Sequence, residues 1–320
     1  MTNVHEPVML NEVLFWLKCG DHSSSDKHSY FDGTLGGGGY TAAILAADSS
    51  SYVTASDLDP LAIQNFWTFT GLDSVQFSSR VNLINAGFSK AIETLENDSQ
   101  IGIVLDLGFS SNQLESGERG FSYQSQFASD VFDLRYNKTT GLPAFEKIKA
   151  LENAHQLGNI IYRNSGEALA QKIAGDVFEL CKSKNKIEIV SVGEIVQAIT
   201  NSVPAKFRNK TNSILSRFWQ AIRIWVNNEF GELETFLPIA HTKLKKGGRL
   251  VIVSFHSLED KLVTHWMRQV SEPESDPVYG NKTYYAKLLT KKAILPSPEE
   301  ISRNPRSRSA LLRCLEKELD

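Results

Sequence analysis

The feature that most constrains the fold of this chain is a run of four glycines, Gly36–Gly39. The short apolar segment Ser29–Asp32 precedes the run, and Thr41–Ala47 after it has helical character. Glycine has no Cβ, so a glycine-rich turn between a strand and a helix lets the backbone approach a ligand closely. A sharp structural turn would also require glycine, so the run alone leaves both interpretations open.

Strands and helices alternate on both sides of a central helical stretch. Strand-like apolar runs occupy residues 52–56, 81–84 and 101–107, and a further run, RLVIVSF, occupies residues 249–255. Nearly continuous apolar runs are typical of parallel strands that helices cover on both faces. The pattern predicts an α/β fold with a doubly wound sheet.

The strand signal stops after about Leu114 and several helices follow. Residues 169–180 place apolar side chains at helical spacing, and Ser191-Val-Gly-Glu194 has the pattern of a capping box. A long amphipathic helix is expected over residues 218–244, ended by Gly247–Gly248. We therefore predict a sheet domain of residues 1–113 and 214–320, interrupted by a helical insertion of residues 114–213 on the substrate side.

Acidic residues lie where this sheet would bind a ligand. Asp57 ends the second strand, 21 positions after Gly36, where a carboxylate can accept both hydroxyls of a ribose. Asp32 directly precedes the glycines, where it would repel a pyrophosphate but suit the cationic amino-acid end of S-adenosylmethionine (SAM). Asp106 ends a buried strand at the ligand-binding edge, although it could also cap the next turn. The pattern favours a SAM-dependent methyltransferase over an NAD-dependent oxidoreductase.

Composition places the chain among ordinary globular proteins. Hydrophobic residues make up 41% and charged residues 22%, which argues against wholesale disorder. The three cysteines lie far apart and form no cluster with histidine, so we expect a reducing compartment and no metal site. No apolar run approaches the roughly 18 residues that cross a bilayer, and no targeting segment is visible. We expect a cytoplasmic protein, or a mitochondrial matrix protein if its source is eukaryotic.

The net charge of −3 hides an uneven distribution. The segment Pro204–Asn228 has no acidic residue and carries five basic ones, namely Lys206, Arg208, Lys210, Arg217 and Arg223. Such a basic face on a mildly acidic chain is a candidate footprint for a polyanion, although a solvated surface explains the charges equally well.

A series of longer motifs then occurs in order between His5 and Arg313. They include DGTLGGGGYTAAIL, SDLDPLAI, DLGFSSNQLESGERGFSY, FWQAIRIWVNNEFGELE, SFHSLED and NPRSRSALLR. Together they resemble the family of small-subunit ribosomal RNA (cytosine-N4)-methyltransferases of bacteria and mitochondria. The resemblance implies a Rossmann-like, SAM-dependent methyltransferase domain interrupted by a helical domain. It also implies methylation of a cytidine in the decoding region of the small-subunit RNA.

The resemblance further implies a cofactor site and some departures from the family. Asp57 would hold the ribose and Phe88 would lie by the adenine, and the other pocket residues would be Gly38, Gly39, Tyr40, Asp106 and Gln113. The family usually has histidine at position 40, and its substrate-side motifs are altered at Val131–Tyr136 and Thr211–Arg217. These departures motivate a second hypothesis, a ribosome-assembly factor that keeps the fold but has lost turnover.

Candidate substrate contacts come from guanidinium groups, which suit the geometry of phosphate. These are Arg119, Arg135, Arg223, Arg306 and Arg308, and His256 after a strand end could orient the substrate. Structural salt bridges or hydrogen bonds would account for each of these residues as well. Asp106 is the candidate acceptor for the amino group of cytosine, and no catalytic base is identified. The expected partner is small-subunit ribosomal RNA or the assembling small subunit.

Overall fold

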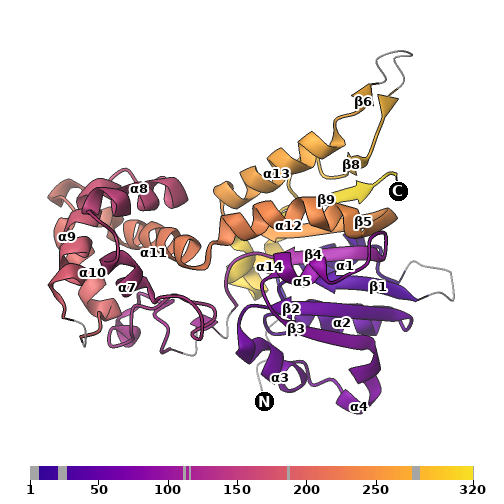
Figure 1. Cartoon of the computed structure of the whole chain (residues 1–320), viewed down its shortest axis with the longest axis horizontal. Helices are drawn as coiled ribbons and strands as arrows, with labels where there is room; N and C mark the ends of the chain where they lie inside the picture. Colours follow the sequence, from indigo (N-terminus) through magenta and orange to yellow (C-terminus); the bar gives the residue numbers. More distant parts are fainter. Residues whose placement is uncertain are drawn as a thin grey trace. The chain divides into compact units, whose positions relative to one another are not determined.

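The computed structural model describes residues 7–20, 27–110, 113–114, 117–185, 188–275 and 282–319. His5, where the motif series begins, lies outside these residues. The chain divides into two compact units (Figure 1). The sheet unit comprises Met1–Phe109 and Gly231–Asp320, and the helical unit comprises Ser110–Phe230.

A seven-stranded sheet forms the centre of the sheet unit, in the order β3-β2-β1-β4-β5-β9-β8. The first five strands in this order are parallel, and β9 runs antiparallel to both β5 and β8. Chain order reverses between the neighbours β1 and β4, so the sheet is doubly wound as predicted, with its switch point there. The strands are β1 (His28–Asp32), β2 (Ser51–Asp57), β3 (Val81–Asn85), β4 (Gln100–Asp106), β5 (Leu244–Ser254), β8 (Ala286–Leu288) and β9 (Leu311–Lys317).

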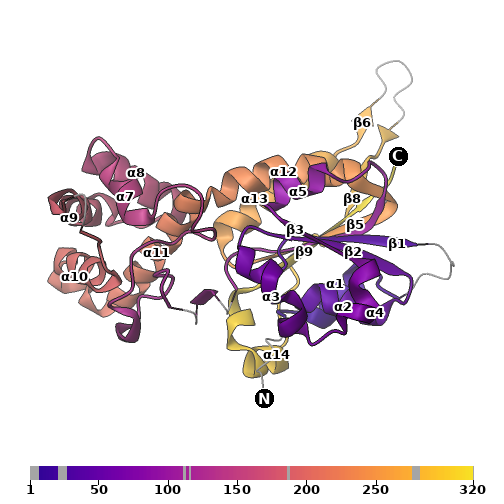
Figure 2. The same ribbon diagram turned by 60° about the horizontal axis from the view of Figure 1, so that its bottom comes forward.

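Helices cover both faces of this sheet, because alternate residues of each buried strand point to opposite sides. Tyr30 and Val104 pack in the core of one face, whereas Phe31 and Ile103 pack in the core of the other. Figure 2 shows α1 and α2 on one side of the sheet and α5 and α12 on the other. The helices are α1 (Leu10–Trp16), α2 (Gly39–Ala47), α3 (Pro60–Thr70), α4 (Ser74–Phe77), α5 (Phe88–Glu93), α12 (Glu229–Lys243), α13 (Ser257–Ser271) and α14 (Pro298–Arg303).

The antiparallel strands at one edge are the part of the sheet that the sequence did not reveal. The segments of β8 and β9 carry charged residues among apolar ones and lack the continuous apolar run of β4. In addition, Gly247–Gly248 lie within β5, where pairing with β4 shifts register, and do not end a helix. A short pair, β6 (Glu274–Ser275) and β7 (Lys282–Thr283), forms a separate two-stranded ribbon.

The helical unit buries one apolar core in which Ile173, Phe218 and Ile222 are fully buried. The predicted capping box is present, since the Ser191 hydroxyl accepts from the Glu194 N–H and the Glu194 carboxylate accepts from the Ser191 N–H. No described helix of either unit has the length and apolar character to cross a membrane. The helices are α7 (Ala144–Lys149), α8 (Ala154–Ser165), α9 (Ala170–Ser183), α10 (Val192–Ser202) and α11 (Thr211–Asn227), with the 3₁₀ turn η3 (Ala205–Lys210) before α11.

The long helix expected over residues 218–244 is two helices. Asn228 has a left-handed conformation with φ of 52°, which ends α11, and α12 begins at Glu229. Asparagine tolerates this conformation better than other residues with a Cβ, so it can end a helix as glycine does. The predicted boundary at 213 therefore falls inside α11, and the structure divides the chain after Phe109 and Phe230 instead.

Candidate functional site

Three carboxylates end neighbouring strands of the sheet unit. Asp32 ends β1, Asp57 ends β2 and Asp106 ends β4. Because β2, β1 and β4 are parallel and adjacent, all three carboxylates lie at the carboxyl edge, beside the switch point. Open α/β sheets bind their ligands at this edge.

The Asp57 carboxylate is tied to the glycine turn. Its Oδ2 accepts from the Gly36 N–H at 2.8 Å and its Oδ1 accepts from the Asp59 N–H at 2.8 Å. Burial raises the pKa of Asp57 to about 6, against the lowering effect of these two hydrogen bonds. Each carboxylate oxygen can accept more than one hydrogen bond, so acceptor capacity remains for a ligand hydroxyl.

The Asp32 carboxylate, which we expected to suit the cationic amino-acid end of SAM, organises the turn after β1. It is fully buried, and its oxygens accept from the Thr41 hydroxyl at 2.8 Å and from the Thr34 N–H at 3.2 Å. Burial raises the pKa of Asp32 to about 6. The Asp32 carboxylate would therefore offer a cationic ligand a buried negative charge, in addition to these two hydrogen bonds.

The Asp106 carboxylate has an oxygen without a partner. Its Oδ1 is buried and makes no hydrogen bond within the described part of the chain. Burial raises the pKa of Asp106 well above its usual value, and the nearby Asp32 and Glu259 add to the effect. The Asp106 N–H donates to the Thr34 hydroxyl oxygen at 2.6 Å, which joins the end of β4 to the turn after β1.

The glycines of the turn make close approaches to protein. Gly38 has φ of 81° and caps α2, and a Cβ there would lie 2.6 Å from Thr70 and 2.7 Å from Phe66 of α3. A Cβ on Gly39 would lie 2.2 Å from Pro7. The structural interpretation of the glycine run therefore holds for these two residues, whatever ligand also lies nearby.

The Tyr40 side chain is buried and donates its hydroxyl hydrogen to the carbonyl oxygen of Val8. Burial raises the pKa of this hydroxyl, with Asp106 and Asp32 contributing further. Tyr40 thus lies close enough to both carboxylates for their negative charge to oppose its ionisation. Its hydroxyl is already committed to the N-terminal segment.

Phe88 begins α5 beside the turn after β1. Its ring packs edge-on against Phe236 of α12 at 5.1 Å between centroids, and a Cβ on Gly33 would lie 3.0 Å from the Phe88 Cβ. The first turn of α5 is capped by Glu232, whose Oε2 accepts from the Ser89 N–H at 3.3 Å. The half-buried ring is therefore held at the carboxyl edge by α12.

Gln113 belongs to the helical unit, apart from the other predicted cofactor residues. Its side chain is buried, and its Oε1 accepts from the Ser110 N–H at 3.0 Å. The Ser110 hydroxyl accepts in turn from the Gln113 N–H at 3.3 Å. These contacts join Gln113 to Ser110, the first residue of the helical unit.

His256 serves as the N-cap of α13. Its Nδ1 accepts from the Glu259 N–H at 3.3 Å, and the Glu259 Oε2 accepts from the Phe255 N–H at 3.0 Å. The two residues thereby form a capping arrangement in which histidine takes the place of serine or threonine. The His256 Nε2 also lies 3.0 Å from the Glu259 Oε1. These contacts account for His256 as a structural residue that caps α13.

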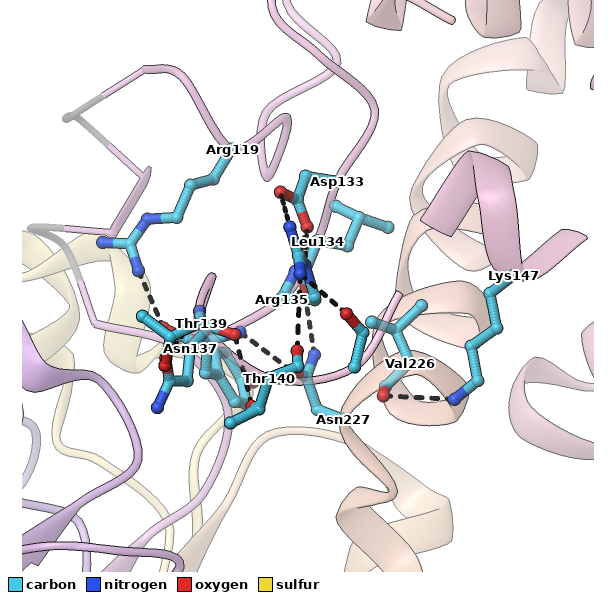
Figure 3. A network of polar contacts seen from close by, with 12 residues as sticks. Arg119, Asp133, Leu134, Arg135, Asn137, Thr139, Thr140, Lys147, Val226 and Asn227 are labelled. Atoms are coloured by element: carbon cyan, nitrogen blue, oxygen red, sulfur yellow. Dashed lines mark hydrogen bonds and ion pairs between the residues drawn. The ribbon is translucent and has the colours of Figure 1, made fainter. Parts of the chain in front are cut away.

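Two of the predicted RNA-binding arginines support one loop of the helical unit (Figure 3). Arg135 pairs with both oxygens of Asp133, at 2.6 and 2.9 Å, and Arg119 donates to the carbonyl oxygen of Tyr136 at 3.0 Å. The Asn227 amide accepts from the Tyr136 N–H and donates to the Leu134 carbonyl. These contacts fix the loop, including Leu134 with its φ of 61°.

Arg223 is buried in α11 and pairs with both oxygens of Glu229, at 2.8 and 2.9 Å. Arg217 pairs with the buried Glu167 at 2.6 Å. The acid-free stretch of sequence thus acquires acidic partners through folding. The exposed basic residues that remain in it are Lys206, Arg208 and Lys210 of η3.

Arg306 and Arg308 are exposed on the 3₁₀ turn η4 (Pro305–Ser309) of the sheet unit. Between them lies Ser307, which is fully buried and donates to the Asn304 carbonyl. The turn is therefore anchored through its serine, and the two arginines on either side of it are exposed. Among the predicted substrate residues, these two match the description of a solvent-facing phosphate contact best.

A cationic nucleoside fits the residues at the carboxyl edge. Three carboxylates with raised pKa values gather there, and one of them has a buried oxygen without a partner. A nearby positive charge would stabilise their ionised forms. In the part of the chain that the structure describes, no group of three or more histidine, cysteine or acidic residues is arranged to hold a metal ion.

Sequence reasoning missed Thr34, Thr41 and Glu259. Thr34 donates its N–H to Asp32 and accepts from the Asp106 N–H with its hydroxyl oxygen, and the Thr41 hydroxyl donates to Asp32. Glu259 accepts from the Phe255 N–H before α13, and its charge helps to raise the pKa of Asp106. The local turn had a signal in the sequence, because an aspartate side chain can accept from the backbone N–H two residues later, here that of Thr34. The pairing of Thr34 with β4 is long-range, and no local pattern reveals it.

The doubly wound sheet with an acidic carboxyl edge is consistent with the Rossmann-like fold of methyltransferases. A family model described as the MraW methylase family matches residues 2–318, and the chain belongs to this family. A protein of Rickettsia canadensis is 38% identical over 98% of this chain and 97% of its own length, and one of Rickettsia bellii is 37% identical over 99% and 100%. Both are named ribosomal RNA small subunit methyltransferase H. A solved rRNA methylase from Streptococcus thermophilus aligns over 96% of this chain and 95% of its own, with 13% identity and a TM-score of 0.36, too low to bear on function.

Proposed function

We propose that this methyltransferase transfers the methyl group of SAM to N4 of a cytidine in the decoding region of small-subunit ribosomal RNA. The observation that carries the proposal is the buried acidic edge of the sheet, centred on the unpartnered oxygen of Asp106. The names of the Rickettsia relatives support ribosomal RNA as the substrate class. The reaction would take place in the cytoplasm, where bacterial ribosomes assemble.

The cofactor residues in this proposal are those at the edge of the sheet. Asp57 would accept the ribose hydroxyls with the capacity left beside the Gly36 N–H, and the Phe88 ring would border the adenine. Asp32 and Asp106 would balance the positive charges of SAM. When bound, SAM supplies an electrophilic methyl group on a sulfonium centre. Gln113 of the helical unit stays a predicted cofactor residue.

Chemistry at N4 needs an acceptor, because the amino lone pair of cytosine is delocalised into the ring. As the bond between N4 and the methyl carbon forms, the bond from that carbon to the sulfonium sulfur would break and the demethylated cofactor would leave, while N4 gains positive charge and must pass a proton to an acceptor. The ionised Asp106 carboxylate has an oxygen available to accept a hydrogen bond from this amino group. A fixed acceptor of this kind stabilises charge as it develops, and holding the two reactants in line contributes further.

Substrate binding in this proposal uses exposed basic residues of both units. Arg306 and Arg308 would contact phosphates from η4, and Lys206, Arg208 and Lys210 would do so from η3. The target cytidine must leave its stack to reach a buried acceptor. The roles of Arg119, Arg135 and Arg223 would be indirect, through the loop and helix that their ion pairs and hydrogen bonds support. We propose the helical unit as the substrate-side domain.

Two measurements test the function. Mass spectrometry of ribosomal nucleosides from cells with and without the gene should show N4-methylcytidine lost when the gene is absent. Purified protein should also transfer a labelled methyl group from SAM to small subunits or their RNA from the deleted strain, in a single turnover. Binding of SAM and of subunits without any transfer would indicate the assembly factor instead.

A further inference from the structure

The segment Pro7–Met9 is bound to the sheet unit at three successive residues. Pro7 lies against Gly39, the Val8 carbonyl accepts from the Tyr40 hydroxyl, and the Met9 N–H donates to Glu300. Val8 and Met9 are themselves buried. This segment therefore covers the first turn of α2, the helix that begins directly at the glycine turn.

The contact with Glu300 comes from the far end of the sequence. The Met9 N–H lies 2.7 Å from the Glu300 Oε1, in a buried hydrogen bond between residues 291 positions apart. Glu300 is held in place because its own N–H donates to the Ser297 hydroxyl at the start of α14. A carboxylate this well buried needs such partners, and Met9 supplies one of them.

Gly39 shows that the segment and the turn are fitted to each other. A Cβ at this position would meet Pro7 at 2.2 Å, a separation that real Cβ atoms essentially never show. Glycine is thus required at position 39 by the segment that covers it. Gly38 is close-packed in the same way, against Phe66 and Thr70 of α3.

We propose that Tyr40 and Glu300 are positioning residues for cofactor binding, which act by holding Pro7–Met9 against the glycine turn. The turn has two glycines with positive φ, Gly36 and Gly38, and such backbone is conformationally free unless its surroundings fix it. Gly36 is also the residue whose N–H holds Asp57. The covering segment therefore keeps the turn in the conformation in which Asp57 is correctly placed. This inference rests on the cofactor site proposed above.

The test is calorimetric binding of SAM and of its demethylated product to the full chain, with no RNA present. Tyr40→Phe removes only the hydroxyl, and Glu300→Ala removes the acceptor of the Met9 N–H. Each should weaken cofactor affinity about 3- to 10-fold, the worth of one buried hydrogen bond. Glu300→Gln keeps an oxygen acceptor and should restore most of the affinity. The KM for small-subunit RNA should not change in any of the three.

A matched control separates positioning from stability. Thr290→Val removes a buried hydrogen bond of the same kind, to the Cys314 N–H in β9, at 2.9 Å. It should lower Tm as much as Tyr40→Phe does but leave cofactor affinity at its wild-type value.

If Tyr40→Phe and Glu300→Ala lower Tm while cofactor affinity stays unchanged, the positioning role is wrong. Should Glu300→Ala fail to fold, Tyr40→Phe decides alone. If wild-type protein binds no cofactor, both this inference and the cofactor site fail, whereas cofactor binding without methyl transfer overturns only the proposed reaction.

Discussion

Asp57 accepts a hydrogen bond from Gly36, so the residue predicted to hold the ribose is itself held by the glycine turn. Replacing Asp57 with alanine should weaken SAM binding by about 1–3 kcal/mol, because ribose hydroxyls lose their acceptor and the Gly36 N–H loses its own. Calorimetry checks the affinity. Asp73→Ala serves as a control, because it removes a similar local cap from the exposed start of α4. Wild-type affinity in the Asp57 variant would contradict the assignment.

Cofactor binding should depend on pH through the acidic edge. The pKa values of Asp32 and Asp57 are raised to about 6, so both carboxylates take up protons in the native state as the pH falls through 6. SAM should therefore bind more weakly at pH 5 than at pH 8, and it should raise Tm less at pH 5. Thermal denaturation with and without SAM across this range is the measurement, and a Tm increment independent of pH would refute the electrostatic role.

The same two groups affect the stability of the protein without cofactor. A carboxylate with a pKa raised above its unfolded value binds its proton more tightly in the native state. Its contribution therefore favours folding most at low pH and is lost as the pH rises from about 4 to about 6. We expect Asp32→Asn to flatten this part of the stability–pH curve, as measured by urea unfolding. An unaltered curve would show that the native Asp32 titrates normally.

Exposed arginines of η4 should contribute to RNA affinity through their charge alone. Removing one phosphate-binding side chain lowers the slope of log affinity against log salt by about 0.7–0.9. Arg306→Ala with Arg308→Ala should thus weaken RNA binding, flatten its salt dependence and leave SAM affinity intact. The control pair Lys245→Ala and Lys246→Ala removes exposed charge near the opposite end of β5. An unchanged slope together with a Tm several degrees lower would assign the arginines to stability.

Arg223 should behave in the opposite way. Removing it leaves the Glu229 carboxylate without its bidentate partner in a largely buried place, which typically costs about 3–5 kcal/mol. Arg223→Ala should accordingly lower the free energy of unfolding strongly without changing the salt slope of RNA binding. Arg208→Ala, on the exposed surface of η3, should do the reverse. A flattened salt slope in the Arg223 variant would restore it as a phosphate contact.

His256 should be replaceable by another capping residue. Asparagine at position 256 can accept from the Glu259 N–H, whereas alanine cannot, and the loss of an N-cap typically costs about 1 kcal/mol. His256→Ala should lower Tm, and His256→Asn should largely retain both Tm and methyl transfer. Loss of transfer in the asparagine variant with Tm preserved would instead point to a role of the imidazole in substrate orientation.

The parallel core of the sheet was predictable because its signals are local. The apolar runs of β4 and β5 and the capping box of α10 each depend on a few adjacent residues. Predictions from such patterns were confirmed by the structure.

Partners distant in sequence were not predictable in the same way. The stretch around Arg217 and Arg223 looked like a basic surface because its acidic partners, Glu167 and Glu229, lie outside it. The requirement for glycine at position 39 was hidden in the same way, because it arises from the close contact with Pro7, 32 positions earlier in the sequence. The apolar pattern continues past Asn228, although α11 ends there. A pattern of apolar residues cannot show that one residue takes a left-handed backbone conformation.

The order in which the chain is synthesised gives strand β9 a particular consequence. β9 lies between β5 and β8, and the Met9 N–H finds its acceptor only in Glu300. While β9 of a growing polypeptide is still inside the ribosome, β5 is an unpaired edge open to wrong partners. The segment Pro7–Met9 must likewise wait for α14 to emerge before it is secured. Strand β5 and the segment Pro7–Met9 therefore both depend on partners that are synthesised after them.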